Sequence, residues 1–314
     1  IPRSKRQGCF LSTKLYIVIM EAWVLFTLLA VVMQSVRTAG QKKITEKISI
    51  QAATLVRFLF GIKFAAIYFA YIYWFYEPIM FEVKTKFFLF GGLASVAQVL
   101  ATVCLINVLS MKNFAVGTSL AKTEAILTAI LGALFFSSTL SFLGYISVFI
   151  GSAGLIFASR WGVVRGGTRN FQSLLYGLCA GLGFALASLW IRGASLSLEV
   201  GPIPGAAAVL LYMVVFQTVI CLLWVALKEP QQLKLIKQNF NACLFIGFTG
   251  VAGSVGWFTA MSLQNPALVR TLGQIEFIIS LLITYLYFDE RVSRQEYLGI
   301  ILIGLSVFLV IRVT

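Results

Sequence analysis

Ten apolar stretches follow one another along the chain, and short polar or charged segments separate them. Each is about as long as a membrane-crossing helix, because roughly 20 residues at a rise of about 1.5 Å span the hydrocarbon core. The stretches cover residues 16–36, 50–76, 87–109, 114–136, 140–159, 171–194, 205–227, 241–263, 266–288 and 295–313. The pattern predicts an all-α integral membrane protein with ten transmembrane helices.

A polar pattern inside the fourth stretch recurs inside the ninth, 152 residues later. Residues 113–137 read NFAVGTSLAKTEAILTAILGALFFS, and residues 265–288 read NPALVRTLGQIEFIISLLITYLYF. The matching positions are Asn113 and Asn265, Glu124 and Glu276, Thr128 and Ser280, and Phe136 and Phe288. Several matches in one register indicate an internal repeat with the two glutamates at its centre.

The segment RWGVVRGGTRN at residues 160–170 divides the ten stretches into five and five. A second repeat that follows an odd number of spans starts from the opposite side of the membrane. We therefore predict two inverted five-helix repeats, with the substrate site between them near the bilayer midplane. The first repeat covers residues 16–160 after a basic segment at 1–15, and the second covers 171–314 after a linker at 161–170. Short turns before residues 114 and 266 also predict a central cavity between the third, fourth, eighth and ninth helices.

The composition fits a membrane protein and excludes several other classes of function. A hydrophobic fraction of 60% and a mean hydropathy of +0.93 exclude an ordinary soluble domain. The net charge of +14 comes from 25 Lys and Arg residues that lie mostly between the apolar stretches, so it indicates lipid headgroups rather than nucleic acid. The chain has no histidine, and its five cysteines are scattered without the spacing of metal ligands. We therefore expect no metal, no cofactor and no enzymatic activity.

The end of the chain carries a resemblance to a known family. Residues 266–311 read PALVRTLGQIEFIISLLITYLYFDERVSRQEYLGIILIGLSVFLVI, and the fourth and fifth stretches copy this pattern in part. The sequence resembles a ten-span EamA-type member of the drug/metabolite transporter superfamily. The first copy departs from that family at SSTLSFLG, where the acidic residue of the turn is absent. The resemblance implies a multi-pass transporter of small metabolites in the cell membrane, which is the inner membrane in a bacterium. It does not name the cargo.

Glu124 and Glu276 are the first candidates for transport chemistry. Glu276 lies eleven residues after Asn265, so a continuous helix would place it near the bilayer midplane. A charge at that depth costs at least about 2.5–3.5 kcal/mol, which makes such a residue functional by default. The structural alternative is a glutamate neutralised by a proton or by a neighbouring cation. Partial removal from water favours the protonated carboxyl, as a proton-coupled carrier requires.

The helical rotation of 100° per residue sorts the charged neighbours of this pair. Lys122 lies on a different face from Glu124, so it serves either the substrate or an interhelical ion pair, for which Glu21 is a candidate. Arg270 and Gln274 share a face of the ninth helix, one turn apart. These residues complete the charged set that we expect near the substrate.

Five further polar or aromatic residues lie within the spans and are weaker candidates for binding substrate or protons. Arg57 is either an anion-binding group or half of a structural pair. The others are Gln98, Trp257, Thr128 and Ser280. Thr128 and Ser280 lie on the same helical faces as the two glutamates, whereas a glutamine or tryptophan within a span more often serves packing.

Three functions compete at this point. The first is a secondary transporter in which a proton on Glu124 or Glu276 is linked to the movement of a small polar metabolite. Mixed charges at depth suit an amino acid or a related zwitterion. The second is an exporter of amphiphilic drugs or lipid-linked headgroups, which favours an aromatic cavity open to lipid. The third is a scaffold or sensor that transports nothing. The expected partners are a small-molecule substrate, protons and membrane lipid, with the protein present as a monomer or homodimer.

Overall fold

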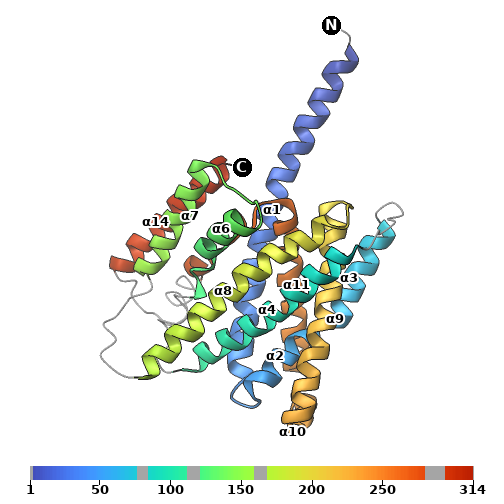
Figure 1. Cartoon of the computed structure of the whole chain (residues 1–314), viewed down its shortest axis with the longest axis vertical. Coiled ribbons are helices and arrows are strands. Elements are labelled where there is room, and N and C mark those ends of the chain that lie inside the picture. Colours follow the sequence, from blue (N-terminus) through green and yellow to red (C-terminus); the bar gives the residue numbers. More distant parts are fainter. Residues whose placement is uncertain (1–2, 76–83, 112–120, 159–167, 280–293, 314) are drawn as a thin grey trace.

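The computed structural model describes residues 3–75, 84–111, 121–158, 168–279 and 294–313, and within these ranges the regular structure is all helical (Figure 1). The helices are α1 Arg3–Ile44, α2 Ile50–Leu59, α3 Ile62–Phe75, α4 Thr85–Ser110, α6 Glu124–Phe135, α7 Phe142–Ala158, α8 Thr168–Leu196, α9 Pro202–Lys228, α10 Gln231–Gln238, α11 Phe240–Leu263, α12 Pro266–Leu272 and α14 Arg294–Val313.

Seven helical segments of the described residues are long and apolar enough to cross a membrane. They are Ala22–Ile44, Ile50–Phe75, Thr85–Ser110, Phe171–Leu196, Pro202–Lys228, Phe240–Leu263 and Arg294–Val313. The helices α6 and α7 are apolar but shorter. The expected fourth and ninth spans extend beyond the described residues, so the total of ten stays a prediction. The chain is a multi-pass membrane protein.

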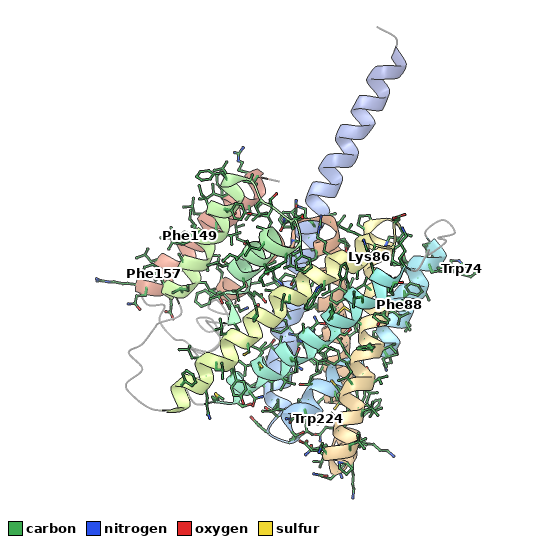
Figure 2. The ribbon with its side chains drawn as sticks, viewed as in Figure 1. Trp74, Lys86, Phe88, Phe149, Phe157 and Trp224 are labelled. Carbon is green, nitrogen blue, oxygen red and sulfur yellow. The ribbon has the colours of Figure 1, made fainter. Side chains whose placement is uncertain are left out.

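Large apolar side chains on the outside of the bundle support the same conclusion. Phe149 and Phe157 of α7, Trp74 of α3 and Trp224 of α9 are each more than half exposed, and Figure 2 labels their positions on these helices. Rings of this size form an extended apolar surface that would be unfavourable in water. In a bilayer the same surface lies against lipid.

The first membrane-spanning segment differs from the expected one. We expected a span at 16–36 followed by a basic loop, whereas α1 continues without interruption to Ile44. Arg37 and Gln41 of this extension are buried, and Gln41 Nε2 donates to the carbonyl of Ala53 in α2 at 3.2 Å. Because polar side chains of the extension lie inside the bundle, they do not end the helix.

The second span also differs, because a turn at Phe60–Gly61 separates α2 from α3. The Gly61 N–H donates to the Phe58 carbonyl at 2.9 Å, which tightens the backbone there. Helix α11 crosses at this point, since a Cβ added to Gly247 would lie 2.5 Å from the Cβ of Phe60. Glycine at 247 is therefore required by the close approach of the two backbones.

The most extensive helix contacts join the first half of the chain to the second: α4 with α8, α1 with α11, and α7 with α14. In the order of the expected spans, α1 and α8 are the first helices of their halves, and α4 and α11 are the third. Exchanging the halves therefore converts the α1–α11 pair into the α8–α4 pair. Two repeats related by a two-fold axis would produce this pattern of helix contacts.

The fifth helices of the two halves, α7 and α14, run antiparallel. The Ser306 hydroxyl donates to the Ser147 carbonyl at 2.7 Å, while a Cβ on Gly299 would lie 2.7 Å from the Gly154 carbonyl oxygen. Ser147 and Gly299 are 152 residues apart, as are Gly154 and Ser306. Exchange of the halves thus converts one contact into the other. Equivalent helices with opposite directions are the arrangement expected of inverted repeats.

The glycines of α11 allow the close packing that their spacing predicts. A Cβ on Gly256 would lie 2.5 Å from the Phe26 carbonyl oxygen and 2.8 Å from the Ala30 Cβ of α1. Trp257 and Phe258 beside it belong to the main core, which lies where α1, α8, α9, α11 and α12 meet. This packing holds α1 and α12 in fixed positions around the charged residues.

Candidate functional site

Arg270 of α12 forms an ion pair with Glu124, the first residue of α6. Its Nη1 lies 3.3 Å from Glu124 Oε1, and its Nε donates to the Ser188 hydroxyl of α8 at 3.0 Å. The guanidinium also lies 4.5 Å from the centroid of the Trp257 ring. A guanidinium has the planar donors to hold a carboxylate, a hydroxyl and an aromatic face at once. Four helices therefore fix this cation.

Lys122 forms a second ion pair, with Glu276. The same carboxylate oxygen, Oε2, accepts a hydrogen bond from Gln34 Nε2 of α1 at 3.1 Å. The Glu276 side chain is 12% exposed and that of Lys122 is 28% exposed. Gln34 in turn accepts a hydrogen bond from Trp257 Nε1 at 2.9 Å, so Trp257 contacts both ion pairs, one through Gln34 and one through Arg270.

Each of these pairs crosses between the two halves of the chain. Glu124 and Lys122 belong to the first half, and their partners Arg270 and Glu276 belong to the second. The structure thus brings together four of the predicted residues, with Trp257 beside them. Lys122 does serve an interhelical ion pair, but its partner is Glu276, whereas the side chain of Glu21 lies outside the described side chains. Removal of one partner of a buried pair is costly, so the charge state of each carboxylate affects the contact between the halves.

The helix that carries Glu276 is broken just before it. We expected a continuous helix over 266–288, whereas α12 ends at Leu272 and residues 273–274 form a turn. The N–H of Glu276 donates to the Gly273 carbonyl at 3.0 Å, and a Cβ on Gly273 would lie 2.5 Å from the Trp257 ring. The tight approach of Trp257 thus requires glycine at the break. Face assignments based on a constant 100° rotation do not extend across it.

A turn at residues 122–123 also precedes Glu124. Interrupted helices at matching places in two repeats are the backbone feature by which many transporters form their binding sites. Both carboxylates therefore lie in the first turn of a helix that begins directly after a turn.

The remaining predicted residues have other roles in the structure. The Thr128 hydroxyl donates to the Glu124 carbonyl at 2.6 Å and is directed at its own helix. Gln274 Nε2 donates to the Ser152 hydroxyl of α7 at 3.3 Å. Gln98 accepts a hydrogen bond from Gln217 of α9 at 2.8 Å, which joins two helices. In these hydrogen bonds, the side chains of Thr128, Gln274 and Gln98 do not bind a charged group.

Arg57 is buried in α2, and its Nη1 donates to the Thr102 hydroxyl at 3.0 Å. Ser280 lies outside the described residues. The sequence reasoning missed Gln34, Arg37 and Ser188. Gln34 and Arg37 lie one helical turn apart, and this spacing could have indicated that both face the same site. Their position at the edge of an apolar stretch instead indicated the end of a span.

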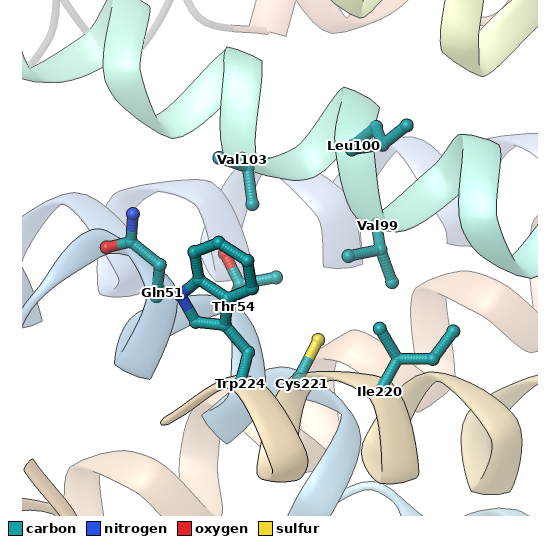
Figure 3. Close-up of a pocket in the computed structure, with 8 residues that line it drawn as sticks. All are labelled: Gln51, Thr54, Val99, Leu100, Val103, Ile220, Cys221 and Trp224. Carbon is teal, nitrogen blue, oxygen red and sulfur yellow. The ribbon is translucent and has the colours of Figure 1, made fainter. Parts of the chain in front are cut away.

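Two pockets within the described residues are largely apolar and lie between helices. One has a volume of about 220 Å³, and Figure 3 shows the residues around it. They are Gln51 and Thr54 of α2, Val99, Leu100 and Val103 of α4, and Ile220, Cys221 and Trp224 of α9. The other, of about 360 Å³, lies between α3 and α11. Neither includes Glu124 or Glu276, and the central cavity stays a prediction. No group of three His, Cys, Asp or Glu residues in the described ranges could hold a metal.

Comparison with known proteins agrees with this architecture. The model of the EamA-like transporter family matches the chain twice, over residues 21–160 and 172–312. No curated protein matches. A solved structure described as "Crystal structure of protein" has 14% sequence identity to the chain and a TM-score of 0.68, over 92% of this chain and 96% of that one. At this identity the likeness concerns the fold alone.

Proposed function

Because the chain belongs to the EamA-like transporter family, we propose that it is a proton-coupled secondary transporter of a small polar metabolite, such as an amino acid or a related zwitterion. The main support for the proposal is that two ion pairs, Lys122–Glu276 and Arg270–Glu124, each join the two repeats. We further propose ten spans in two inverted repeats over residues 16–160 and 171–314. The antiparallel α7 and α14 and the exchange of helix pairs support this arrangement.

The ion pairs suggest how a proton and a substrate could share one site. While Glu276 is ionised, it holds Lys122 of the other repeat. A proton on Glu276 removes that attraction, and Lys122 becomes available to a carboxylate of the substrate. The pair Glu124–Arg270 also consists of one carboxylate and one cation, but here the carboxylate belongs to the first repeat and the cation to the second. A zwitterion can replace the partners in such pairs without leaving a charge unpaired inside the membrane.

The two pockets described above are relevant to the alternative function, in which the protein exports an amphiphilic drug or a lipid-linked headgroup. The residues that line them are mostly apolar or aromatic and include none of the charged candidates. Binding there would leave proton coupling without a physical link to the solute. The structure therefore gives no specific support to this alternative. A scaffold that transports nothing would use the ion pairs only for stability.

Purified protein in liposomes tests the proposal with a panel of solutes, measured with and without a pH gradient. The panel contains neutral and charged amino acids, simple carboxylates, a sugar and a lipophilic cation. We expect the pH gradient to drive uptake of at least one zwitterion or carboxylate. Transport of the lipophilic cation alone would favour a drug exporter, and no transport of any solute would favour a scaffold.

A further inference from the structure

Two buried arginine side chains inside the bundle approach the same residue of α11. Arg37 of α1 is 3% exposed and Arg57 of α2 is 4% exposed. Both side chains approach Gly250 of α11, because a Cβ added there would lie 3.2 Å from Arg57 Cγ and 3.7 Å from Arg37 Cδ. Glycine at 250 thus leaves space for both arginine side chains.

The described residues supply little to offset these two charges. Neither arginine forms a salt bridge there, while Glu124 and Glu276 each contact a different cation. Arg57 has the neutral Thr102 hydroxyl, and Arg37 Nε is buried without a hydrogen-bond partner. Arg37 is attracted by Glu276, but Arg37 and Arg57 repel each other, and Arg270 repels both. The local charge is positive.

Buried charge of one sign requires a counter-charge, because an ion that leaves water without a partner loses several kcal/mol of solvation. Guanidinium donors match the oxygens of carboxylates and phosphates in pairs. Resting on the proposed transport function, we propose that Arg37 and Arg57 together bind an anionic group of the transported solute, a carboxylate or a phosphate. The unsatisfied Nε of Arg37 and the remaining donors of Arg57 supply the hydrogen bonds.

The site would select among solutes by charge. A solute without an acidic group would leave both guanidiniums uncompensated, whereas a carboxylate or phosphate group would neutralise one of them directly and reduce their repulsion. Glu276 attracts Arg37 electrostatically, which links the arginine site to that carboxylate. The substrate class is therefore narrowed to solutes that carry at least one acidic group.

Equilibrium binding in a zwitterionic detergent, without any pH gradient, tests the inference separately from transport. The probes are succinate, inorganic phosphate and L-glutamate, with glycerol and 1,5-diaminopentane, which carry no acidic group, as counterparts at equal ionic strength. We expect at least one anionic probe to raise the melting temperature by a few degrees at about ten times its Kd. Arg37→Gln and Arg57→Gln should abolish the rise, and Lys63→Gln, which removes an exposed cation of the adjacent α3, should retain it.

Gly250→Asp provides a second test that does not remove either arginine. Its carboxylate would lie beside both arginine side chains, so it should raise the melting temperature without any probe and remove the response to anions. Gly250→Ala is the steric control, with a Cβ but no charge. An aspartate variant that is less stable than the alanine variant and still responds to anions would overturn the proposal.

A separate experiment tests whether the bound anion is a lipid headgroup rather than a soluble solute. In it, short-chain phosphatidylglycerol is added in place of the solutes. Stabilisation by this lipid alone, with no response to the soluble probes, would overturn the assignment to a transported solute. So would an anion response that survives Arg37→Gln and Arg57→Gln, or no response of the parent protein to any probe. Anion binding that depends on the arginines, in a protein that transports nothing, would contradict the proposed function and leave the anion site in place.

Discussion

Lys122 of the first repeat is paired with Glu276 of the second, so the Glu276 carboxylate is one of two that bind a cation of the other half of the chain. Gln34 binds the same carboxylate oxygen and links it to Trp257, which lies against Arg270 of the other pair. The contact between the repeats therefore includes a connected polar group in addition to apolar packing. Such a group responds to protonation, which apolar packing does not.

Replacing Lys122 with methionine should destabilise the protein more than replacing Glu276 with glutamine. Methionine leaves the Glu276 carboxylate without Lys122, and because this pair is partly exposed the cost should lie below the about 3–5 kcal/mol of a fully buried pair. Glutamine removes the charge and leaves Lys122, which is 28% exposed, with some access to water. The double variant should be more stable than Lys122→Met alone. Thermal unfolding of the four proteins measures this, and a double variant as unstable as Lys122→Met would contradict the pairing.

A larger residue at position 299 should separate α7 from α14. A Cβ on Gly299 would lie 2.2 Å from the Ala158 Cβ and 2.7 Å from the Gly154 carbonyl oxygen, and the latter is backbone that cannot rotate away. We expect Gly299→Ala to lower the free energy of unfolding by about 1–3 kcal/mol. Gly304→Ala is the matched control on the same helix, because a Cβ there meets nothing within 4 Å. Equal melting temperatures for the two variants would show that α7 and α14 do not pack this closely.

The helices and the two glutamates could be predicted from the sequence for a physical reason. Apolar length determines which segments can cross a bilayer, and a carboxylate within such a segment is rare enough to stand out. The 152-residue register then relates Glu124 to Glu276 without any structure. These features are local or periodic, so they are visible in a single sequence.

The partners of the charged residues could not be predicted, because they depend on how helices cross. Lys122 is 154 residues away from Glu276, and nothing in its own helix indicates that partner. The break at Gly273 was also missed, since a glycine in an apolar stretch is more often a packing contact than an interruption. Gln34 and Arg37 lie at the edge of a stretch, where polar residues usually end a span. Their burial depends on the position of α11 and α12 beside α1.

The exposed pair of Lys84 and Glu199 should give the protein a small dependence on pH. Lys84 lowers the pKa of the Glu199 carboxyl through a hydrogen bond and its positive charge. A depressed pKa in the folded state means that the contribution to stability is present above the unfolded pKa and is lost as the pH falls through the folded one. Glu199→Gln should therefore lower the melting temperature slightly at neutral pH and not at acid pH. Glu46→Gln, at an exposed acid without an ion pair in the described residues, is the control. A pH-independent difference would contradict the pair.

Glu276→Gln should abolish proton coupling while leaving substrate binding in place, and it should do so more completely than Glu124→Gln. Glutamine resembles the protonated carboxyl in shape and cannot release a proton, so a carrier with glutamine at 276 is held in one charge state. Glu276 contacts Lys122 and Gln34 and interacts with Arg37, whereas the described contact of the Glu124 carboxylate is with Arg270. A change at Glu276 therefore alters more of the contact between the repeats.

The measurement for this prediction is twofold, in the same liposomes. Exchange of labelled for unlabelled substrate at equal pH should survive Glu276→Gln, because exchange requires no net proton movement. Uptake driven by a pH gradient should be lost. Glu199→Gln, which removes a carboxylate from the surface, controls for the loss of a charge as such. If both glutamine variants retain gradient-driven uptake at the parent rate, neither carboxylate carries the proton, and the two ion pairs only stabilise the contact between the repeats.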